Sequence, residues 1–375
     1  MLTTISTAMI ADGSGIFATL LGYGHTFFAA IIVLGALIFV HEFGHFIVAK
    51  KLGVGVEKFS LGFGPKILGK QIGDTEYLLS AIPLGGYVKL TGEDAEEECE
   101  DKEHSFAEAL VWRRLAIVSA GPIFNILFAV LIFTIVYMVG VPLISSGVGK
   151  IRDDSPALKA GLLPGDKITA IDGQAIKLWD QLREVVHNSP DKELIFTISR
   201  NQKEFDMVII PESRKTKNLF GEEIHVGLIG IEPEPTAFIT ERYNPIIATY
   251  KGFQKTWEIT YLTVVAIKKL FERVIPADTI GGPIMIFQIA GQQAKAGILQ
   301  LVFFVALLSI NLGILNLLPI PILDGGHILF FLIEIVFGKP VTAKKREIAQ
   351  QIGMAMLISL MVFAFYNDIM RICCQ

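Results

Sequence analysis

Charged residues are scarce in this chain of 375 residues. Asp, Glu, Lys and Arg make up 19% of it, whereas 52% of the residues are hydrophobic. A soluble domain carries about 25% charged residues, so this balance indicates a protein that has lipid for solvent. The formal net charge of −4, and the lack of a basic cluster with interleaved aromatic residues, give no reason to expect a nucleic-acid partner.

Cysteine is scarce as well. Cys99, Cys373 and Cys374 are the three in the chain, too few for a disulfide framework or a four-thiolate zinc site. The first 20 residues contain neither Lys nor Arg, so they lack the basic segment that begins a cleavable signal peptide. We therefore expect the first apolar helix to stay in the mature protein.

Long apolar runs, in contrast, are abundant. A helix needs about 20 predominantly apolar residues to span a bilayer, and we expect transmembrane helices at 24–49, 114–141, 299–324 and 352–370. Lys and Arg accumulate between the first and second helices and between the third and fourth. Under the positive-inside rule the two loops at 50–113 and 325–351 are cytoplasmic, and both termini, including 1–23, are extracytoplasmic.

Residues 142–235 read as a charged globular domain inserted between the second and third helices. Turn signals follow one another there: Ala160-Gly161 to end a short helix, Pro164-Gly165-Asp166 for a turn and Asp172-Gly173 for a hairpin. The run resembles a PDZ domain of the kind attached to bacterial proteases. A small β-rich domain of another kind is the alternative.

The segment 236–298 is expected to lie on the membrane rather than to cross it. Pro245 suits a first helical turn, and Ile280-Gly281-Gly282-Pro283 gives a flexible break that we interpret as a hinge for a gate, with an ordinary turn as the alternative. Basic residues interrupt the apolar positions at helical spacing, as in a surface helix: Lys251, Lys255, Lys268 and Lys269.

The pattern His41-Glu42-Phe43-Gly44-His45 lies at the end of the first apolar run. Residues four apart share one face of a helix, so the two imidazoles can converge on one zinc ion. Glu42 beside them can act as the general base on a water that zinc activates. An ionisable group in an apolar helix costs about 2.5–3.5 kcal/mol near the bilayer centre, which favours a functional interpretation over a structural one.

Two histidines leave a zinc site incomplete, so a third ligand has to come from elsewhere. Asp324 is the one acidic residue between Leu299 and Ile333, and the predicted topology returns it to the side of the membrane where the first helix ends. A carboxylate is an acceptable zinc ligand; His327 is the rival. Pro319 and Pro321 break the helix just before Asp324, which is tolerated at membrane depth only where the backbone lines a cavity or is covered by protein.

Taken together, these motifs resemble those of the site-2 protease family of intramembrane zinc metalloproteases. The resemblance covers nearly the whole chain: H-E-F-G-H in the first helix, N-x-x-P-x-P-x-L-D-G in the third, and the PDZ-like insert. It implies that His41, His45 and Asp324 bind zinc, that Glu42 is the catalytic base and that water completes the coordination. The best-known bacterial member carries two tandem PDZ domains and this insert has room for one, so gating by paired domains cannot be assumed for this chain.

The resemblance also implies a substrate-binding region. Glycine-rich segments between Val54 and Leu90 would form a β-structured loop that re-enters the membrane and holds an unwound substrate by main-chain hydrogen bonds; an ordinary cytoplasmic hairpin is the alternative. For Asn316 a role at the site is weighed against a simple helix-to-helix bond, and Asn125 is interpreted as the latter. The candidate substrate-binding residues are Asn316, Pro319, Pro321, Gly62, Phe63, Gly64, Gly85 and Gly86.

The sequence thus predicts an α-helical integral membrane protein with four transmembrane helices, an inserted extracytoplasmic α+β PDZ domain and a membrane-re-entrant β-loop. We expect a zinc metalloendopeptidase of the bacterial inner (cytoplasmic) membrane, with its active site toward the cytoplasm. Its substrates would be single-span membrane proteins, such as an anti-sigma factor or remnant signal peptides. A non-catalytic PDZ-bearing receptor or scaffold is the alternative. A zinc transporter is weaker, because helices two and four offer few polar sites.

Overall fold

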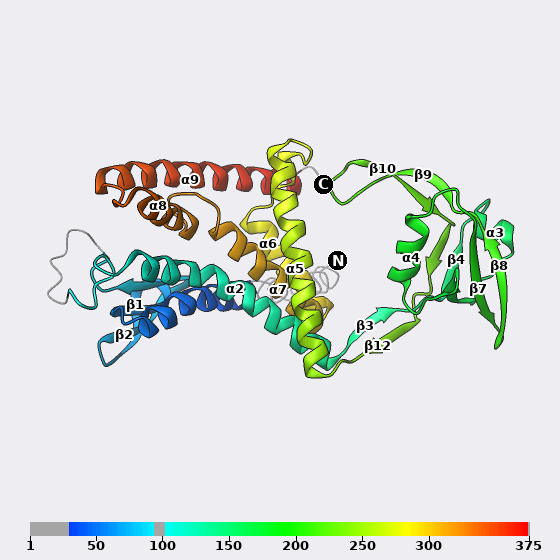
Figure 1. Ribbon diagram of the computed structural model, residues 1–375, viewed down its shortest axis with the longest axis horizontal. Coiled ribbons are helices and arrows are strands. Elements are labelled where there is room, and N and C mark those ends of the chain that lie inside the picture. The colour runs from blue at the N-terminus through cyan, green and yellow to red at the C-terminus, as the bar shows by residue number, and fades with distance from the viewer. Residues whose placement is uncertain (1–29, 94–101, 374–375) are drawn as a thin grey trace, which may run out of the picture. The chain divides into compact units, whose positions relative to one another are not determined.

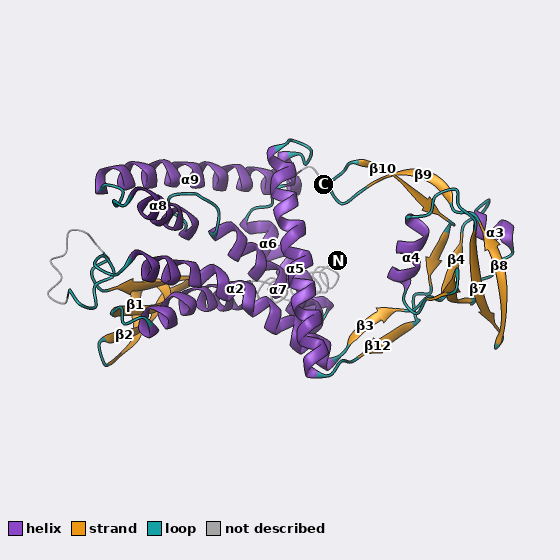
Figure 2. Cartoon of the chain, in the orientation of Figure 1, coloured by secondary structure: helices purple, strands orange, loops and turns teal. Residues whose placement is uncertain are grey.

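The computed structural model describes residues 30–93 and 102–373. The chain divides into two compact units. A helical unit comprises Met1–Thr134, Thr249–Val265 and Ala277–Gln375, and an α+β unit comprises Ile135–Ala248 and Ala266–Pro276. Figure 1 gives the order of the elements along the chain, and Figure 2 shows that most strands belong to the α+β unit.

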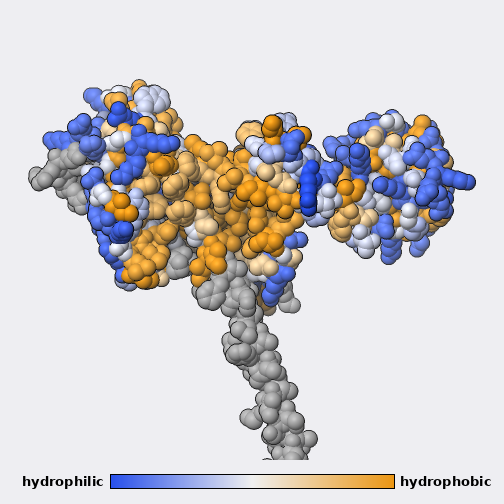
Figure 3. Space-filling view, turned by 90° about the horizontal axis from the view of Figure 1, so that it is seen from below, coloured by the Kyte–Doolittle hydropathy of each residue, from blue (hydrophilic) through white to orange (hydrophobic). Residues whose placement is uncertain are grey.

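Four of the described helices are long and apolar enough to cross a membrane: Ala30–Lys51, α2 (Val111–Val139), α7 (Ile298–Asn316) and α9 (Ala343–Cys373). They contain 22, 29, 19 and 31 residues, close to or above the roughly 20 that a bilayer requires. Figure 3 shows apolar side chains gathered on the surface of the helical unit. Lipid solvates such a surface and water does not, so the prediction of four apolar helices in a membrane protein is confirmed.

Several helix ends differ from the expected ones. The first residues of the helix expected at 24–49 fall outside the described residues. The helix expected at 299–324 ends at Asn316, and after residues 317–323 a separate helix, α8 (Asp324–Phe337), begins. Pro319 and Pro321 account for this break, because proline lacks the N–H that a continuing helix needs.

Asp324 therefore opens a helix instead of closing one, and α8 occupies part of the loop expected at 325–351. The fourth helix expected at 352–370 is longer in the structure, since α9 already begins at Ala343. Its first turns, Lys344 to Gln351, are rich in Lys, Glu, Gln and Ala. Such residues have high helix propensity but no hydrophobic signal.

The strands β1 (Val56–Ile72) and β2 (Thr75–Leu90) bend to form a small antiparallel sheet. Residues 56–61 lie in its middle and pair with 76–79 on one side and with 86–90 on the other. Gly62, with φ of +92°, allows the bend. The run 86–90 is thereby left at one edge of this sheet.

Helix α5 (Pro245–Phe271) lies across α2 within the helical unit. A Cβ on Gly252 would sit 2.8 Å from Thr134 Oγ1, so the absence of a side chain permits the close approach. Thr263 Oγ1 donates a hydrogen bond of 3.1 Å to Asn311 Oδ1 of α7. A 3-10 helix, η1 (Ala277–Thr279), and α6 (Pro283–Ala296) follow α5.

The last turns of α9 hold the segment η1–α6 in place. Asp368 is buried and accepts hydrogen bonds from the backbone N–H groups of Gly282 (2.9 Å) and Met285 (3.1 Å). Asn367 donates to the carbonyl oxygen of Ala277, at 3.1 Å. We call these contacts of Asn367 and Asp368 the α9 clasp.

The α+β unit is built around a four-stranded antiparallel sheet of order β6-β5-β7-β8. Its core is apolar and includes the fully buried Phe196 and Ile198. Gly161, in the left-handed region at φ +89°, ends α3, and Ser155 caps the start of that helix. The elements are β3 (Val141–Ile144), β4 (Val148–Ile151), α3 (Pro156–Ala160), β5 (Lys167–Ile171), β6 (Gln174–Ala175), α4 (Trp179–His187), β7 (Leu194–Arg200), β8 (Lys203–Ile209), β9 (Glu212–Lys217), β10 (Glu223–Leu228), β11 (Ile231–Pro233) and β12 (Phe238–Glu241).

Candidate metal centre

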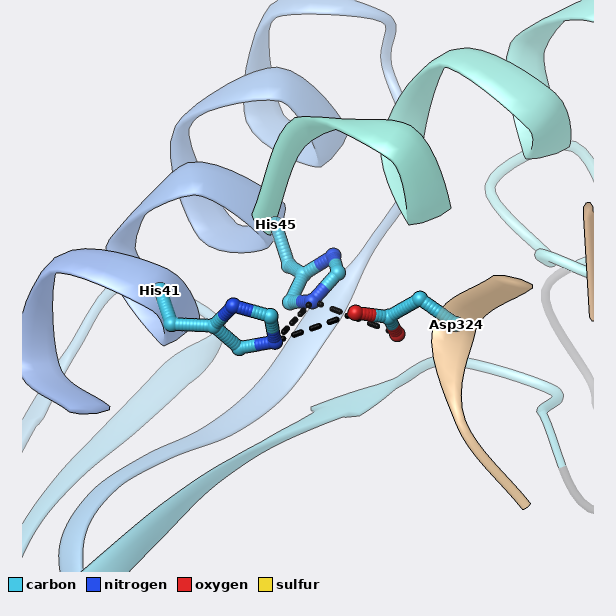
Figure 4. A group of neighbouring side chains, drawn as sticks. All are labelled: His41, His45 and Asp324. Atoms are coloured by element: carbon cyan, nitrogen blue, oxygen red, sulfur yellow. Dashed lines mark hydrogen bonds and ion pairs between the residues drawn. The ribbon is translucent and has the colours of Figure 1, made fainter. Parts of the chain in front are cut away.

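Two imidazoles project from one face of the Ala30–Lys51 helix, as Figure 4 shows. His41 and His45 are one helical turn apart, and their Nε2 atoms lie 3.3 Å from each other. The ring planes are nearly perpendicular, at 83°. Both Nε2 atoms therefore face the same small volume beside the helix.

Asp324 brings a carboxylate to this volume. Its Oδ2 lies 3.1 Å from His41 Nε2 and its Oδ1 lies 3.6 Å from His45 Nε2. One ligand atom from each of the three residues lies within 4.8 Å of the others. His327, the rival ligand, is one turn further along α8, outside this group, and its ring contacts Phe330.

The two glycines after Asp324 explain how α8 can start here. A Cβ on Gly325 would overlap the carbonyl oxygen of Leu318, and one on Gly326 would overlap that of Ile320. The first turn of α8 therefore rests directly on the backbone of residues 317–321, which contains Pro319 and Pro321. The sequence L-D-G-G thus fixes Asp324 at the start of a helix that is packed tightly on the preceding break.

These donors fit a metal ion. Asp324 Oδ2 is buried and makes no hydrogen bond of good geometry among the described residues, and its polar neighbour is His41 Nε2 at 3.1 Å. A buried carboxylate is costly unless it is paired or coordinates a cation. Two imidazole nitrogens and one carboxylate are the ligand set of many catalytic zinc sites, in which a fourth position stays open. The chemistry of the donors therefore favours zinc, and a cation between them would satisfy the Asp324 carboxylate.

Glu42 lies next to the donors without being one of them. It lines the same cavity of about 510 Å³ as His41, His45 and Asp324. The backbone of Val88 hydrogen-bonds the Glu42 carboxylate. This contact directs the carboxylate of Glu42 toward the edge of the β1–β2 sheet.

The predicted substrate-binding residues divide into those at the centre and those at the sheet. Asn316, the last residue of α7, lies with Nδ2 3.4 Å from His41 Nε2. A Cβ on Gly86 would sit 3.2 Å from Glu42 Cγ, so this glycine borders the site directly. The ring of Phe63 covers Gly85, where a Cβ would overlap it.

The remaining predicted residues shape the backbone around the site. Gly62 and Gly64 both have positive φ, +92° and +85°, at the bend of β1. Pro319 and Pro321 lie in the break before α8. Their position explains the local course of the chain, and a contact with substrate stays a prediction for all of them.

Helix α2 supplies features of the centre that sequence reasoning missed. Asn125 Nδ2 lies 3.1 Å from His41 Nδ1, and the carbonyl oxygen of Ile117 lies 2.8 Å from His45 Nδ1. A Cβ on Gly121 would overlap His45 Nε2. The sequence-based interpretation of Asn125 as a simple helix-to-helix contact is therefore incomplete, because its side chain also contacts His41. An available signal was its helical spacing from Gly121, since residues four apart share a face.

An ion pair borders the cavity on the side of α8. Arg114 Nη2 lies 2.6 Å from Glu334 Oε1, and the Arg114 guanidinium stands 5.1 Å from the ring centre of Phe331. Both charged groups are largely buried and ordered by these contacts. The pair ties α2 to α8, and so links the helix behind the histidines to the helix that carries Asp324.

Fold and centre together are those of a multi-pass membrane protein with a candidate metal site at an H-E-x-x-H motif. The model of the family described as peptidase family M50 matches residues 29–360. The chain therefore belongs to peptidase family M50, the site-2 protease family. The predicted family and the predicted metalloprotease class are confirmed.

Named relatives agree with this assignment along nearly the whole chain. The regulator of sigma-E protease RseP of Escherichia coli is 32% identical over 445 residues, covering 91% of this chain and 98% of that protein. Protease RseP of Yersinia pestis is 32% identical over 447 residues, with 92% and 98% covered. An inferred zinc metalloprotease of Agrobacterium fabrum is 38% identical over 354 residues, with 90% and 94% covered.

Proposed function

We propose that His41, His45 and Asp324 hold a zinc ion, and that Glu42 is the general base of an intramembrane protease that cuts the transmembrane segments of single-span membrane proteins. The observation that carries this proposal is the convergence of three ligand atoms within 4.8 Å. They come from two apolar elements that are remote in sequence. The zinc metalloproteases among the relatives support the choice of metal.

The chemistry assigns separate tasks to the metal and to the protein. When bound, zinc supplies the Lewis acidity that makes a water nucleophilic near neutral pH and polarises the scissile carbonyl. Glu42 accepts the proton of the attacking water and passes it to the leaving amine as general acid. The backbone of Val88 orients the Glu42 carboxylate for both proton transfers.

We assign the β1–β2 sheet to substrate binding. A transmembrane helix hides its peptide bonds in its own hydrogen bonds, so it has to be unwound before it is cut. An extended peptide can add to an exposed strand edge through main-chain hydrogen bonds. The run 86–90 pairs with β1 on one side, and the backbone of Val88 within this run hydrogen-bonds Glu42, which supports this assignment.

The α+β unit is assigned as a PDZ domain on the extracytoplasmic side. Its helix cap at Gly161, its turn at Gly165 and its hairpin turn at Asp172-Gly173 support the assignment, since each has the positive φ that these turns require. A domain there would obstruct substrates that still carry a bulky ectodomain. Substrates would then be proteins already trimmed outside the membrane, such as an anti-sigma factor, or remnant signal peptides.

We assign the protein to the bacterial inner membrane on its similarity to bacterial relatives. The distribution of Lys and Arg supports an orientation with both termini extracytoplasmic. The amphipathic α5 would lie at the extracytoplasmic membrane surface. Its exposed Tyr250, Trp257 and Tyr261 recur at helical spacing, and such amphipathic rings favour the headgroup level. The centre itself would lie toward the cytoplasmic side, where the Ala30–Lys51 helix ends.

The proposal is tested with a tagged single-span substrate and purified protein in lipid vesicles. Replacing Glu42 by Gln keeps the side-chain shape and removes the base, so we expect no detectable cleavage and an unchanged zinc content. Glu108→Gln, at an exposed position, is the matched control and should cleave normally. Cleavage that persists in the Glu42→Gln protein would sink the assigned role, and zinc retained in His45→Ala would sink the ligand set.

A further inference from the structure

The Nδ1 atoms of both histidines, which point away from Asp324, contact a single helix, α2. His45 Nδ1 lies 2.8 Å from the carbonyl oxygen of Ile117, and His41 Nδ1 lies 3.1 Å from the side-chain amide of Asn125. Ile117 and Asn125 lie one turn before and one turn after Gly121, and positions four apart share one face of a helix. One face of α2 therefore contacts both imidazoles from behind.

These contacts bear on the tautomer of each ring. A neutral imidazole carries its proton on one nitrogen, and the other nitrogen is the one that can bind a metal. A backbone carbonyl can only accept, so the Ile117 oxygen requires the proton of His45 on Nδ1. The lone pair of His45 Nε2 is then directed toward Asp324.

His41 presents the same atom to Asp324, with Nε2 3.1 Å from Oδ2. For that Nε2 to bind a metal, the proton of His41 has to be on Nδ1, and Nδ1 then needs an acceptor. Asn125 is the side chain opposite Nδ1, and it is completely buried. Because Asn125 is closed off from bulk solvent, we assign the hydrogen bond of Nδ1 to the amide.

The amide of Asn125 can act as that acceptor. Its Oδ1 has no hydrogen-bond partner among the described residues and is free for this purpose. The oxygen and nitrogen of a side-chain amide exchange places when the group turns by half a rotation. In the turned orientation Oδ1 faces Nδ1–H of His41 at the same separation.

We propose that Asn125 is a positioning residue that accepts a hydrogen bond from Nδ1–H of His41 through Oδ1 and so presents Nε2 to the metal. The Ile117 carbonyl does the same for His45. Helix α2 contributes no ligand, yet it sets the tautomer and orientation of both. This inference rests on the ligand set proposed above.

The surroundings of Asn125 favour a fixed geometry. Ser309 Oγ of α7 donates a hydrogen bond of 2.7 Å to the backbone carbonyl of Asn125. Gly313 brings α7 close to the same turn, since a Cβ there would lie 2.9 Å from the carbonyl oxygen of Pro122. Asn125 is thus anchored from the far side, as a residue that orients a ligand should be.

The decisive comparison is between a variant that keeps an acceptor and one that removes it. Asn125→Asp has nearly the same shape and can only accept, whereas Asn125→Leu can do neither. Outer partners of metal ligands are worth about 10- to 100-fold in affinity. We expect the zinc dissociation constant, from chelator competition on the full-length protein in detergent, to rise by that factor in Asn125→Leu and by less than threefold in Asn125→Asp.

A second readout follows the geometry of the site. Cobalt bound in place of zinc gives a visible spectrum that depends on the ligand arrangement. We expect Asn125→Asp to keep the wild-type band positions and Asn125→Leu to shift them. A tenfold or larger loss of affinity in Asn125→Asp would mean that the amide donates to His41, and would overturn the inference even if Asn125→Leu does not fold.

Two controls separate this inference from its alternatives. Asn311→Leu removes a different interhelical hydrogen bond of α7, the one from Thr263, and should leave zinc affinity unchanged. An equal loss in Asn311→Leu would reduce Asn125 to a general helix-packing residue. His41→Ala reports on the ligand set alone: zinc retained there defeats the proposed function, whereas zinc lost there with wild-type affinity in Asn125→Leu defeats only the inference about Asn125.

Discussion

Each proposed ligand of the candidate metal centre is held in place by a second residue that lies outside the sequence motif. The carbonyl of Ile117 holds His45, Asn125 contacts His41, and Gly325 lets Asp324 start its helix against the preceding loop. Such supports determine where a ligand atom points, and misplacement by about 1 Å can cost 10²-fold in rate. At this scale the centre is defined by its supports as much as by its ligands.

A single buried acid in the α+β unit gives a prediction about pH. Burial raises the pKa of the Asp166 carboxyl, but hydrogen bonds from Arg200 (2.6 and 2.7 Å) and from the backbone N–H of Leu163 (2.8 Å) outweigh it and lower the pKa below its ordinary value of 3.8. The folded state therefore favours the charged carboxylate. Its stabilising effect is complete above pH 3.8 and is lost as the pH falls through the lowered pKa.

We expect Asp166→Asn to destabilise the α+β unit by about 2 kcal/mol at neutral pH, because hydrogen bonds to charged groups are worth roughly that much. The difference from wild type should stay constant down to about pH 4 and shrink below it. Urea unfolding followed by the fluorescence of Trp179, with the other two tryptophans replaced by Phe, measures it. Arg214→Gln, at an exposed ion pair, is the control, and a difference that grows in acid would contradict the argument.

The residues proposed as ligands and base could be picked out from the sequence, and the residues that contact them could not. H-E-x-x-H fixes His41, Glu42 and His45 by spacing within one helix, and Asp324 stands alone as an acid in an apolar run. Gly121 and Asn125 acquire their meaning only where α2 crosses behind the histidines. That crossing depends on tertiary packing, on which local spacing carries no information.

Two elements approach the centre from opposite sides through glycines, which gives a paired prediction. A Cβ on Gly121 of α2 would overlap His45 Nε2, whereas a Cβ on Gly86 of β2 would lie 3.2 Å from Glu42 Cγ. We expect Gly121→Ala to lose zinc by at least tenfold in affinity, and Gly86→Ala to keep zinc while kcat falls by about 10²-fold. Metal analysis and cleavage kinetics on the same preparations separate the two outcomes.

A matched substitution on the same stretch of α2 completes that test. Ile123→Ala changes an exposed side chain and should alter neither zinc content nor cleavage. Equal zinc loss in Gly86→Ala and Gly121→Ala would show that the sheet also supports the ligands. Unchanged zinc in Gly121→Ala would show that α2 can move away from His45 without consequence.

At the scale of elements, hydrophobicity located the membrane helices but not their true ends. Apolar length gave four helices, yet the third stops at Asn316 and α8 begins at Asp324. Both α7 and α8 are apolar, so composition shows no boundary between them, and only Pro319 and Pro321 indicate one. The order of the strand segments in the β1–β2 sheet could not be predicted from the sequence either. The chain bends at Gly62, and residues 56–61 pair with 76–79 on one side and with 86–90 on the other.

Across the whole molecule, the metal centre joins distant parts of the chain. His41 and His45 belong to the first described helix, and Asp324 follows about 280 positions later in the chain. The contact between Asn316 and His41 joins residues that are 275 positions apart. A bound ion would link these elements directly to one another. Binding to the folded state alone stabilises it by mass action.

We expect removal of zinc to lower the thermal midpoint of the full-length protein in detergent. With free zinc at one hundred times its dissociation constant, the bound ion adds about 2.7 kcal/mol. Differential scanning fluorimetry with and without chelator measures the shift. Asp324→Ala should show a low midpoint that the chelator no longer changes, whereas a chelator effect of wild-type size in that variant would remove Asp324 from the ligand set.

At the same scale, the class of molecule could be predicted and the internal arrangement could not. Scarce charge and four apolar runs were enough to indicate a membrane protein, because lipid is the only solvent that such a surface suits. The contact of α5 with α2 at Gly252, and the hold of α9 on η1–α6, link segments that are far apart along the chain. The sequence pattern of one segment in each pair does not predict which other segment it contacts.

The α9 clasp makes the C-terminal turns of the protein relevant to a segment that lies some distance before them. Shortening α9 ahead of Asn367 would leave the N–H groups of Gly282 and Met285 without the carboxylate that receives them. Loosening of α6 would follow, since unpaired backbone groups are unfavourable in an apolar setting. Proteins truncated before Asn367 to ease crystallisation would therefore have an altered α6. A C-terminal tag should be added after the α9 clasp and should not replace it.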